Sequence, residues 1–195
     1  MFWALVVVGS GLCACAAEPT AQIRASTDKI LALLGDPALN TDTRSAERRQ
    51  LIRNELEERV DWATVARSGL GRHWAKRTEA EKVEFTALFS RFLVETALDK
   101  FETNYVQLEK IDYLGEKIID DYASVKAQVT TKDQIVHPVE YRLQKSGKGW
   151  RIYDLLLEGV SLAKNYRDQF DEILAKSPYE KLVADLRAKT PNGSP

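Results

Sequence analysis

Few residues of this 195-residue chain have the types and spacing that metal binding or catalysis needs. Its two histidines, His73 and His137, are far apart in the sequence, and its two cysteines, Cys13 and Cys15, fall within the first seventeen residues. A zinc site in the rest of the chain would take most of its ligands from Asp and Glu, without any local spacing to support it. We therefore expect no metal site and no cofactor.

Two pairs of carboxylates are the remaining candidates for chemistry. Asp120 and Asp121 are adjacent, a pattern typical of turns, whereas Asp154 and Glu158 lie on one expected strand. Acid–base catalysis would need a nucleophile or substrate-binding donors beside them, and the neighbouring sequence supplies neither. Gly-x-Ser-x-Gly, Walker and Rossmann signatures are also absent. We expect structural roles for these carboxylates and no enzyme activity.

The composition and charge of the chain indicate which binding partners to expect. The chain is 44% hydrophobic and 29% charged, with a formal net charge of −1. Nucleic-acid binding usually requires a basic excess, so we expect no nucleic-acid partner. The length suits one domain, which we place at residues 18–195 and expect to be a monomer.

The N-terminal segment, residues 1–17, differs from the rest. An apolar run from Phe2 to Leu12 is too short for a stable membrane anchor and is followed by small residues. This pattern predicts a secretory signal peptide with cleavage after Ala16 or Ala17, although no Lys or Arg precedes the run. The alternative is a lipoprotein signal in which Cys15 is acylated.

Helical spacing of apolar residues dominates the first half of the chain. It predicts helices over 20–34 and 46–67, the second restarting at Asp61, whose side chain can cap it. Thr78 and Glu81 form a capping box that opens the longest helix, from Glu79 to Thr103. Two helices, over 162–176 and after Pro178, are expected at the C-terminal end.

Alternating patterns between these helices predict four strands, over 106–116, 122–131, 135–145 and 150–157. Short turn-forming connections between them favour an antiparallel meander. Pro138 lacks a backbone donor, so its strand is expected at an edge or bulged there. The predicted fold is α+β, a curved antiparallel sheet of about four strands with helices on one side.

The stretch from Gly149 to Phe170 joins the sheet to the helices. Regular alternation would place Trp150, Ile152, Asp154 and Leu156 on one face of its strand. Gly159 suits a tight turn after Glu158, and Ser161 can cap the helix that follows.

The chain is rich in large apolar side chains. The helix from Glu79 carries four phenylalanines, and the strands add one apolar face. These residues either fill a core or line a cavity for an apolar ligand, and sequence periodicity alone does not separate the two. The residues predicted to line such a cavity are Phe85, Phe89, Phe92, Leu93, Ala97, Phe101, Val125, Ala127, Val129, Val139, Tyr141, Leu143, Ile152, Leu156 and Val160.

Several motifs resemble those of the MlaC family, also called toluene-tolerance auxiliary proteins. The longest resemblance covers Trp150–Asp154, Glu158–Ser161 and Asn165–Phe170. Three further elements, Leu70–Trp74, Thr78–Phe92 and Pro138–Leu143, are also similar to family elements, with His73 and Glu140 as departures.

This resemblance implies a periplasmic phospholipid carrier, exported by its signal peptide. It further implies that the predicted fold encloses an apolar cavity. The cargo would be a phospholipid whose acyl chains are buried in the cavity and whose head group remains outside. The implied partners are an inner-membrane ABC transporter with an MCE-domain subunit and an outer-membrane lipoprotein complex. Two alternatives remain: a small isomerase-like enzyme on a cone-shaped fold, with Asp154 or Asp121 as base, and an envelope adaptor protein without lipid cargo.

Overall fold

The computed structural model describes residues 18–41 and 43–190. The expected signal peptide, with Cys13 and Cys15, lies outside the described residues. The α-helices are α1 (Pro19–Gly35), α2 (Ser45–Arg59), α3 (Trp62–Leu70), α4 (Glu79–Asn104), α5 (Leu162–Lys176) and α6 (Tyr179–Ala188), with 3-10 helices η1 (Gly71–Lys76) and η2 (Tyr105–Gln107). The strands are β1 (Leu108–Ile119), β2 (Tyr122–Thr131), β3 (Val136–Ser146), β4 (Gly149–Leu157) and β5 (Val160–Ser161).

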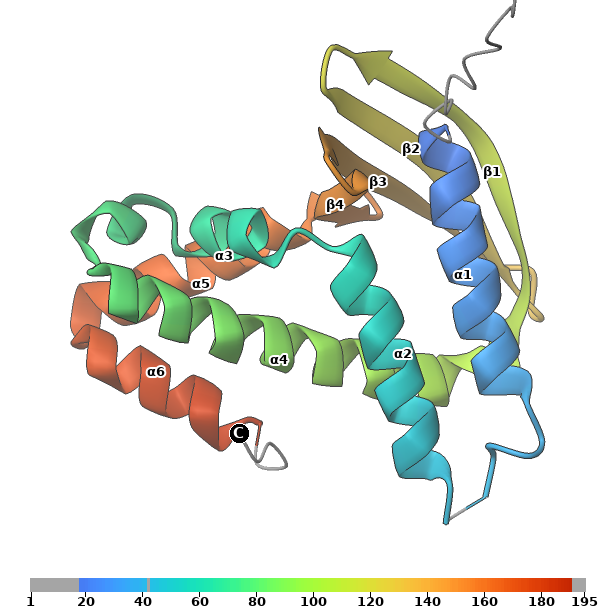
Figure 1. Ribbon diagram of the computed structural model, residues 1–195, viewed down its shortest axis with the longest axis horizontal. Helices are drawn as coiled ribbons and strands as arrows, with labels where there is room; N and C mark the ends of the chain where they lie inside the picture. Colours follow the sequence, from blue (N-terminus) through green and yellow to red (C-terminus); the bar gives the residue numbers. More distant parts are fainter. Residues whose placement is uncertain (1–17, 42, 191–195) are drawn as a thin grey trace, which may run out of the picture.

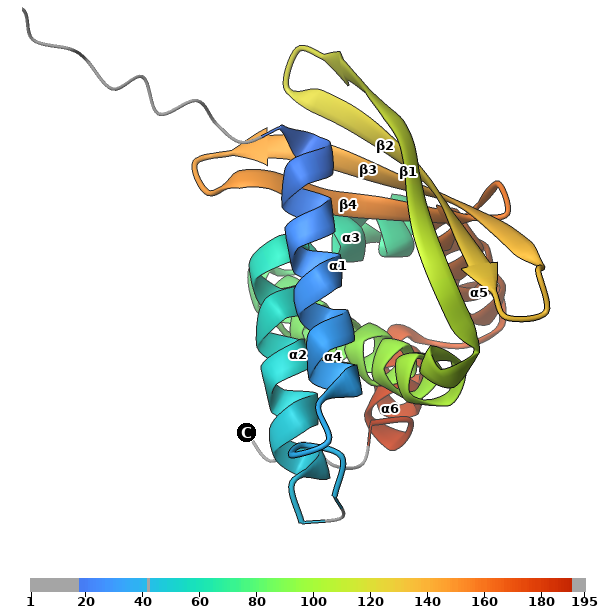
Figure 2. The same cartoon turned by 90° about the vertical axis from the view of Figure 1, so that its right-hand side faces the viewer.

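The strands form one antiparallel sheet in the order β1-β2-β3-β4-β5, which confirms the predicted meander. The sheet is curved, and α1 runs across its concave side (Figures 1 and 2). Helices α3 to α6 form a second body beside it, and α5 leaves the sheet from its β5 end (Figure 2). The α+β class with helices on one side of the sheet is therefore confirmed.

The predicted helix boundaries follow local capping. Asp61 accepts a hydrogen bond from the Thr64 N–H at 3.1 Å, which restarts the chain as α3 after α2 ends. The Asp61 N–H in turn donates to the Ile152 carbonyl at 2.8 Å and ties this corner to β4. The capping box of Thr78 and Glu81 is present at the start of α4.

Pro138 was expected at a sheet edge or a bulge, and this prediction was wrong in part. It lies in β3, between β2 and β4, and pairs in regular register with Gln128. The pairing of β3 with β4 ends one residue later, at Val139 and Leu157. The proline therefore occupies a local edge within an inner strand, where its missing N–H is tolerated.

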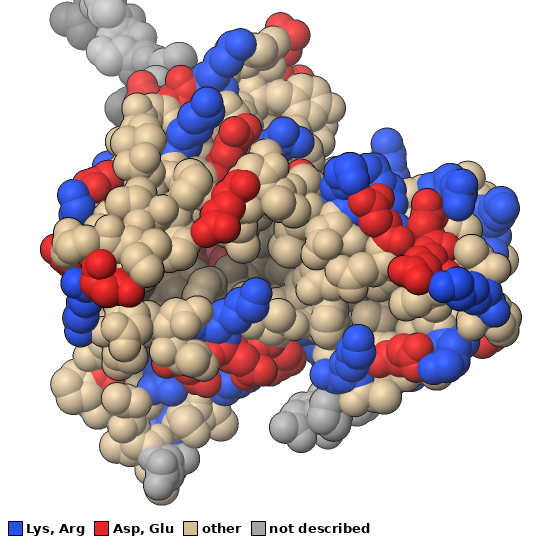
Figure 3. Space-filling view, turned by 180° about the vertical axis from the view of Figure 1, so that it is seen from behind, with Lys and Arg blue, Asp and Glu red and all other residues tan. Residues whose placement is uncertain are grey.

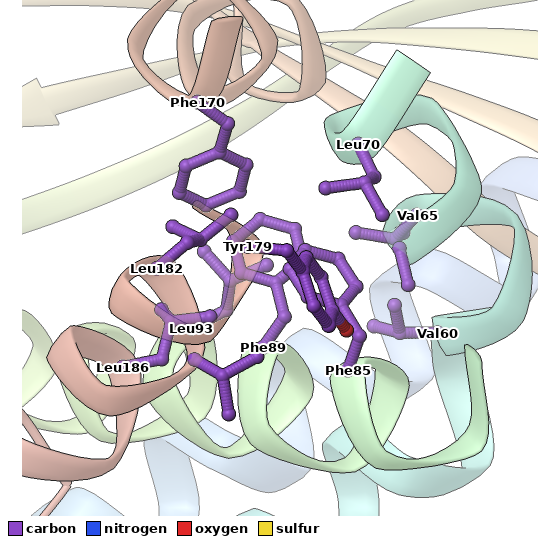
Figure 4. Close-up of a cluster of buried hydrophobic side chains, with 12 residues drawn as sticks. Val60, Val65, Leu70, Phe85, Phe89, Leu93, Phe170, Tyr179, Leu182 and Leu186 are labelled. Atoms are coloured by element: carbon purple, nitrogen blue, oxygen red, sulfur yellow. The ribbon is translucent and has the colours of Figure 1, made fainter. Parts of the chain in front are cut away.

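Buried apolar residues gather into three clusters. The largest lies between α3, α4, α5 and α6, where Phe85 and Phe89 pack against Phe170 and Tyr179 (Figure 4). A second joins Ile23 of α1 to the concave side of the sheet. A third joins α1 and α2 to the C-terminal half of α4. The sheet and the helical body thus have distinct cores, and the partly buried Ile152 contacts both.

Candidate functional site

A deep hollow opens on the side of the molecule opposite to the view of Figure 1. Figure 3 shows it between the surface of the sheet and that of α4 with its neighbours. Its visible walls are neither basic nor acidic, whereas Lys, Arg, Asp and Glu side chains stand around its rim (Figure 3). An apolar concavity with a charged rim is the arrangement expected of a site for an apolar ligand.

The inner face of the sheet is the face turned toward α1 and the hollow. Residues directly opposite each other on neighbouring strands share a face, and Val125, Leu143 and Tyr141 pack with Ile23 of α1. Among the residues that the register assigns to the inner face are Tyr113, Ala123, Val125, Ala127, Val129, Val139, Tyr141, Leu143, Ile152, Leu155 and Leu157.

Ala127 and Val139 show where the packed core of the sheet ends. They are cross-strand partners and are 1% and 8% exposed. Neither belongs to any of the three clusters of buried residues. Both side chains are thus withdrawn from solvent without being packed into a helix core, as expected beside a concavity.

A bulge in β4 changes which of its residues face inward. The pairing with β3 shifts between Arg142 and Leu143, so that Leu143 pairs with Ile152 but Tyr141 pairs with Leu155. Leu156 instead pairs with Glu140 and lies on the opposite face from Ile152. The regular alternation expected for this strand, which put Ile152 and Leu156 together, was therefore wrong beyond Tyr153.

Apart from Leu156, the predicted lipid-binding residues lie in the helical cluster, on the inner face of the sheet, along the rest of α4 and at β5. Those packed in the helical cluster are Phe85, Phe89, Leu93 and, at its edge, Phe92 and Ile152. Those on the inner face of the sheet are Val125, Ala127, Val129, Val139, Tyr141, Leu143 and Ile152. Phe101 packs against the α1–α2 cluster, and Ala97 is half-buried on α4. Val160 is 61% exposed at the β5 end of the sheet.

Sequence reasoning missed four of these inner-face residues. Tyr113 belongs to β1, where Gly115 has a φ of 142° beside a register shift, and Arg24 of α1 stacks on its ring at 4.4 Å. Ala123 was left out although it continues the alternation of Val125 and Ala127 in β2. Leu155 and Leu157 were assigned to the wrong face because the β4 bulge was not recognised. A glycine within a strand is the one signal that pointed to such irregularity.

Tyr141 is the polar residue best enclosed by this inner face. Burial raises the pKa of its hydroxyl to about 12. The group therefore stays neutral near pH 7.

The candidate carboxylates have structural partners. Asp154 accepts from the Leu155 and Ala163 N–H groups at 2.9 and 3.1 Å and from the Ser161 hydroxyl at 2.6 Å, which confirms the structural role expected of it. Glu158, expected to accept from backbone donors, instead meets His137 Nδ1 at 2.8 Å. His73 meets Asp171 at 2.7 Å.

The described residues give no indication of a metal site or of a membrane-spanning helix. Residues 18–41 and 43–190 contain no group of three or more His, Cys, Asp or Glu side chains placed to hold a metal ion. Within the same residues, no helix combines the length and apolar character needed to cross a bilayer.

Known proteins resemble this chain in sequence and in fold. The model of the MlaC protein family matches residues 24–188. Toluene tolerance protein ttg2D of Pseudomonas putida is 33% identical over 55 residues, which are 28% of this chain and 26% of that protein, so the chain spans about a quarter of that relative.

A solved structure gives the corresponding comparison of folds. It is a phospholipid-binding protein from Ralstonia solanacearum in complex with a phospholipid, with a TM-score of 0.76 and 23% sequence identity. The match covers 90% of this chain and 98% of the other, and it shows a shared fold. Because the family match extends over residues 24–188, this chain belongs to the MlaC family.

Proposed function

We propose that this protein is a periplasmic phospholipid carrier whose hollow holds the acyl chains. The observation that carries the proposal is the separation of the sheet core from the helical core, with a hollow of uncharged walls between them (Figure 3). Membership in the MlaC family and the fold shared with a phospholipid-binding protein support the same function.

The wall of the site combines the sheet with the half of α4 nearest to it. Its proposed members on the sheet are Val125, Ala127, Val129, Val139, Tyr141, Leu143, Ile152, Leu155 and Leu157. Leu155 takes the place of Leu156, which lies on the other face. Leu93, Ala97 and Phe101 are the proposed contribution of α4, whereas Phe85 and Phe89 support it from the filled helical cluster.

The energetics suit a carrier. Each buried methylene contributes roughly 0.8 kcal/mol, so two chains of about fifteen carbons would resist release to water by roughly 20 kcal/mol before the costs of binding. Such contacts have little directional preference. A carrier of this kind needs only to match the membrane closely enough to load and unload.

The family membership also guides the proposal for location and partners. A signal peptide at residues 1–17 would export the chain, and residues 18–195 would form the lipid-binding domain. The proposed partners are the inner-membrane ABC transporter with its MCE-domain subunit and the outer-membrane lipoprotein complex. In this scheme the protein carries lipid between them without chemical conversion.

An isomerase-like enzyme fits the described residues less well. Such an enzyme would need a carboxyl group with a raised pKa at the floor of the cavity. For Glu55 and Glu95, burial favours a raised pKa, but hydrogen bonds and positive charges from neighbouring side chains lower the pKa overall. Asp154, one of the two bases considered for the enzyme alongside Asp121, accepts three structural hydrogen bonds.

A pair of variants on one strand tests the proposal. Val129→Lys puts a charge on the inner face, whereas Gln128→Lys puts the same charge on the opposite face of β2. We expect Val129→Lys to abolish transfer of radiolabelled phosphatidylglycerol between donor and acceptor vesicles, because a buried unpaired charge is costly. Gln128→Lys should transfer lipid at the wild-type rate. Equal transfer by both variants, each folded by circular dichroism, would exclude the inner face as the binding wall.

A further inference from the structure

Tyr166 carries a hydroxyl group at the edge of the aromatic cluster between α4 and α5. Its ring lies 5.3 Å from that of Phe89, 5.7 Å from that of Phe92 and 5.9 Å from that of Phe170. Phe89 and Phe170 are buried, but Phe92 and Tyr166 are only half-buried. The ring of Tyr166 is thus held on one side by the cluster and open on the other.

The hydroxyl of Tyr166 has no hydrogen-bonding partner among the described residues. Its oxygen is also not among the enclosed polar atoms that lack a partner, which include Tyr113 Oη and Trp62 Nε1. The hydroxyl is therefore open to whatever occupies the space beside it. Burial of the ring raises the pKa of Tyr166, so the group stays a protonated donor near pH 7.

Helix α5 connects the sheet to α4, the two parts of the molecule that border the hollow. It follows β5 directly, and Val160 of β5 pairs with Leu157 at the end of the inner face. Within two turns, Tyr166 reaches Phe89 and Phe92 of α4. Tyr166 therefore bridges α5 to α4 near the end of the sheet, and the hollow lies between the sheet and α4 (Figure 3).

A hydrocarbon chain laid over this hydroxyl would remove its water without replacing the lost hydrogen bond. Burying a hydroxyl group in this way is unfavourable unless the ligand supplies an acceptor. Acyl chains have no acceptor along their length. In a phospholipid, the acceptors nearest to the chains are the two ester carbonyl oxygens.

We propose that Tyr166 donates a hydrogen bond to an ester carbonyl of the bound lipid and so selects diacyl over dialkyl ether phospholipids. This inference rests on the proposed carrier function. It fixes the glycerol end of the cargo at the α5 side of the hollow and directs the hydrocarbon toward Ala127 and Val139. Tyr166 is then a positioning residue that determines which class of phospholipid, diacyl or dialkyl ether, is held more tightly.

The test compares two lipids that differ only in their linkage. The full-length mature protein is loaded with dioleoyl phosphatidylglycerol or with its dialkyl ether analogue, and release to phosphatidylcholine vesicles is timed. Wild type should release the ether lipid about threefold to tenfold faster, the usual worth of one neutral hydrogen bond. Tyr166→Phe, which keeps the ring packing, should release both lipids at the same rate.

Tyr153→Phe is the matched control, because Tyr153 packs edge-on against the half-exposed Tyr122 on another part of the sheet. It should keep the wild-type difference between the lipids. An unchanged ester-to-ether ratio in Tyr166→Phe would overturn the inference, as would faster release of both lipids by the same factor, which would indicate a phosphate contact. Failure of wild type to load either lipid would instead contradict the carrier function itself.

Discussion

Asp154 is the buried carboxylate that joins the end of β4 to the start of α5. It is 8% exposed, and its oxygens accept from two backbone N–H groups and from Ser161, the residue that caps α5. The sequence predicted the turn, the cap and the structural role of Asp154. It did not predict that one carboxylate would connect all three.

Replacing Asp154 with Asn tests this connection. An amide keeps the shape but puts donors where the carboxylate accepts, so we expect a loss of about 1–3 kcal/mol in the free energy of unfolding. Urea denaturation measures it. Asp168→Asn, at an exposed ion pair with Lys164, should change the free energy of unfolding far less. Equal effects from the two substitutions would contradict the assigned role.

For Phe89, sequence periodicity identifies the apolar face of the helix but does not tell whether the side chain fills a core or lines a cavity. The pattern placed it correctly on the apolar face of α4, but core and cavity wall have the same pattern. The structure places Phe89 at 1% exposure among Phe85, Phe170 and Tyr166.

Phe89→Ala should therefore act mainly on stability. Removing a buried phenylalanine typically costs about 3–5 kcal/mol, and we expect a matching fall in the urea midpoint. Val139→Ala, at the edge of the hollow, should cost much less and act mainly on lipid retention. A small stability effect of Phe89→Ala would mean that its ring faces open space.

At the scale of elements, helices were more predictable than strands. Helix starts depend on local caps, and Asp61, Thr78 and Ser161 each accept the predicted hydrogen bond. Strand faces depend on register, which a single bulge reverses. The shift between Arg142 and Leu143 has no clear mark in the sequence, so the second half of β4 was assigned to the wrong face.

Two neighbouring leucines of β4 test the corrected register. Leu155→Lys should remove bound lipid, because Leu155 pairs with Tyr141 on the inner face. Leu156→Lys should retain it, because Leu156 pairs with Glu140 on the other face. Phosphorus analysis of the purified variants measures bound phospholipid. Loss of lipid in Leu156→Lys alone would show that Leu156, and not Leu155, lies on the inner face.

The capping box of α4 gives a prediction for pH. A hydrogen bond from the Thr78 backbone N–H, opposed by partial burial, lowers the pKa of Glu81 below its ordinary 4.5. A lowered folded-state pKa stabilises the fold above pH 4.5, and the contribution is lost as pH falls through the lower value. The difference in melting temperature between wild type and Glu81→Gln should therefore shrink from pH 6 to pH 3. A constant difference would show that the ionised carboxylate is not what stabilises the cap.

At the scale of the molecule, the hollow follows from how the cores are divided. The sequence predicted a curved sheet with helices on one side and an apolar surplus, and these features are present. The separation of this surplus into three clusters depends on contacts such as Ile23 with Val125 and Asp61 with Ile152. Those contacts join residues far apart in the chain, so local patterns do not specify them.

Native mass spectrometry of the protein, purified from cells without detergent, detects directly whether the chain carries a phospholipid. We expect a mass increment equal to a phospholipid, released intact on activation, and its absence in Val129→Lys but not in Gln128→Lys. Wild-type protein that carries no lipid from the cell and takes none up from vesicles would contradict the proposed carrier function.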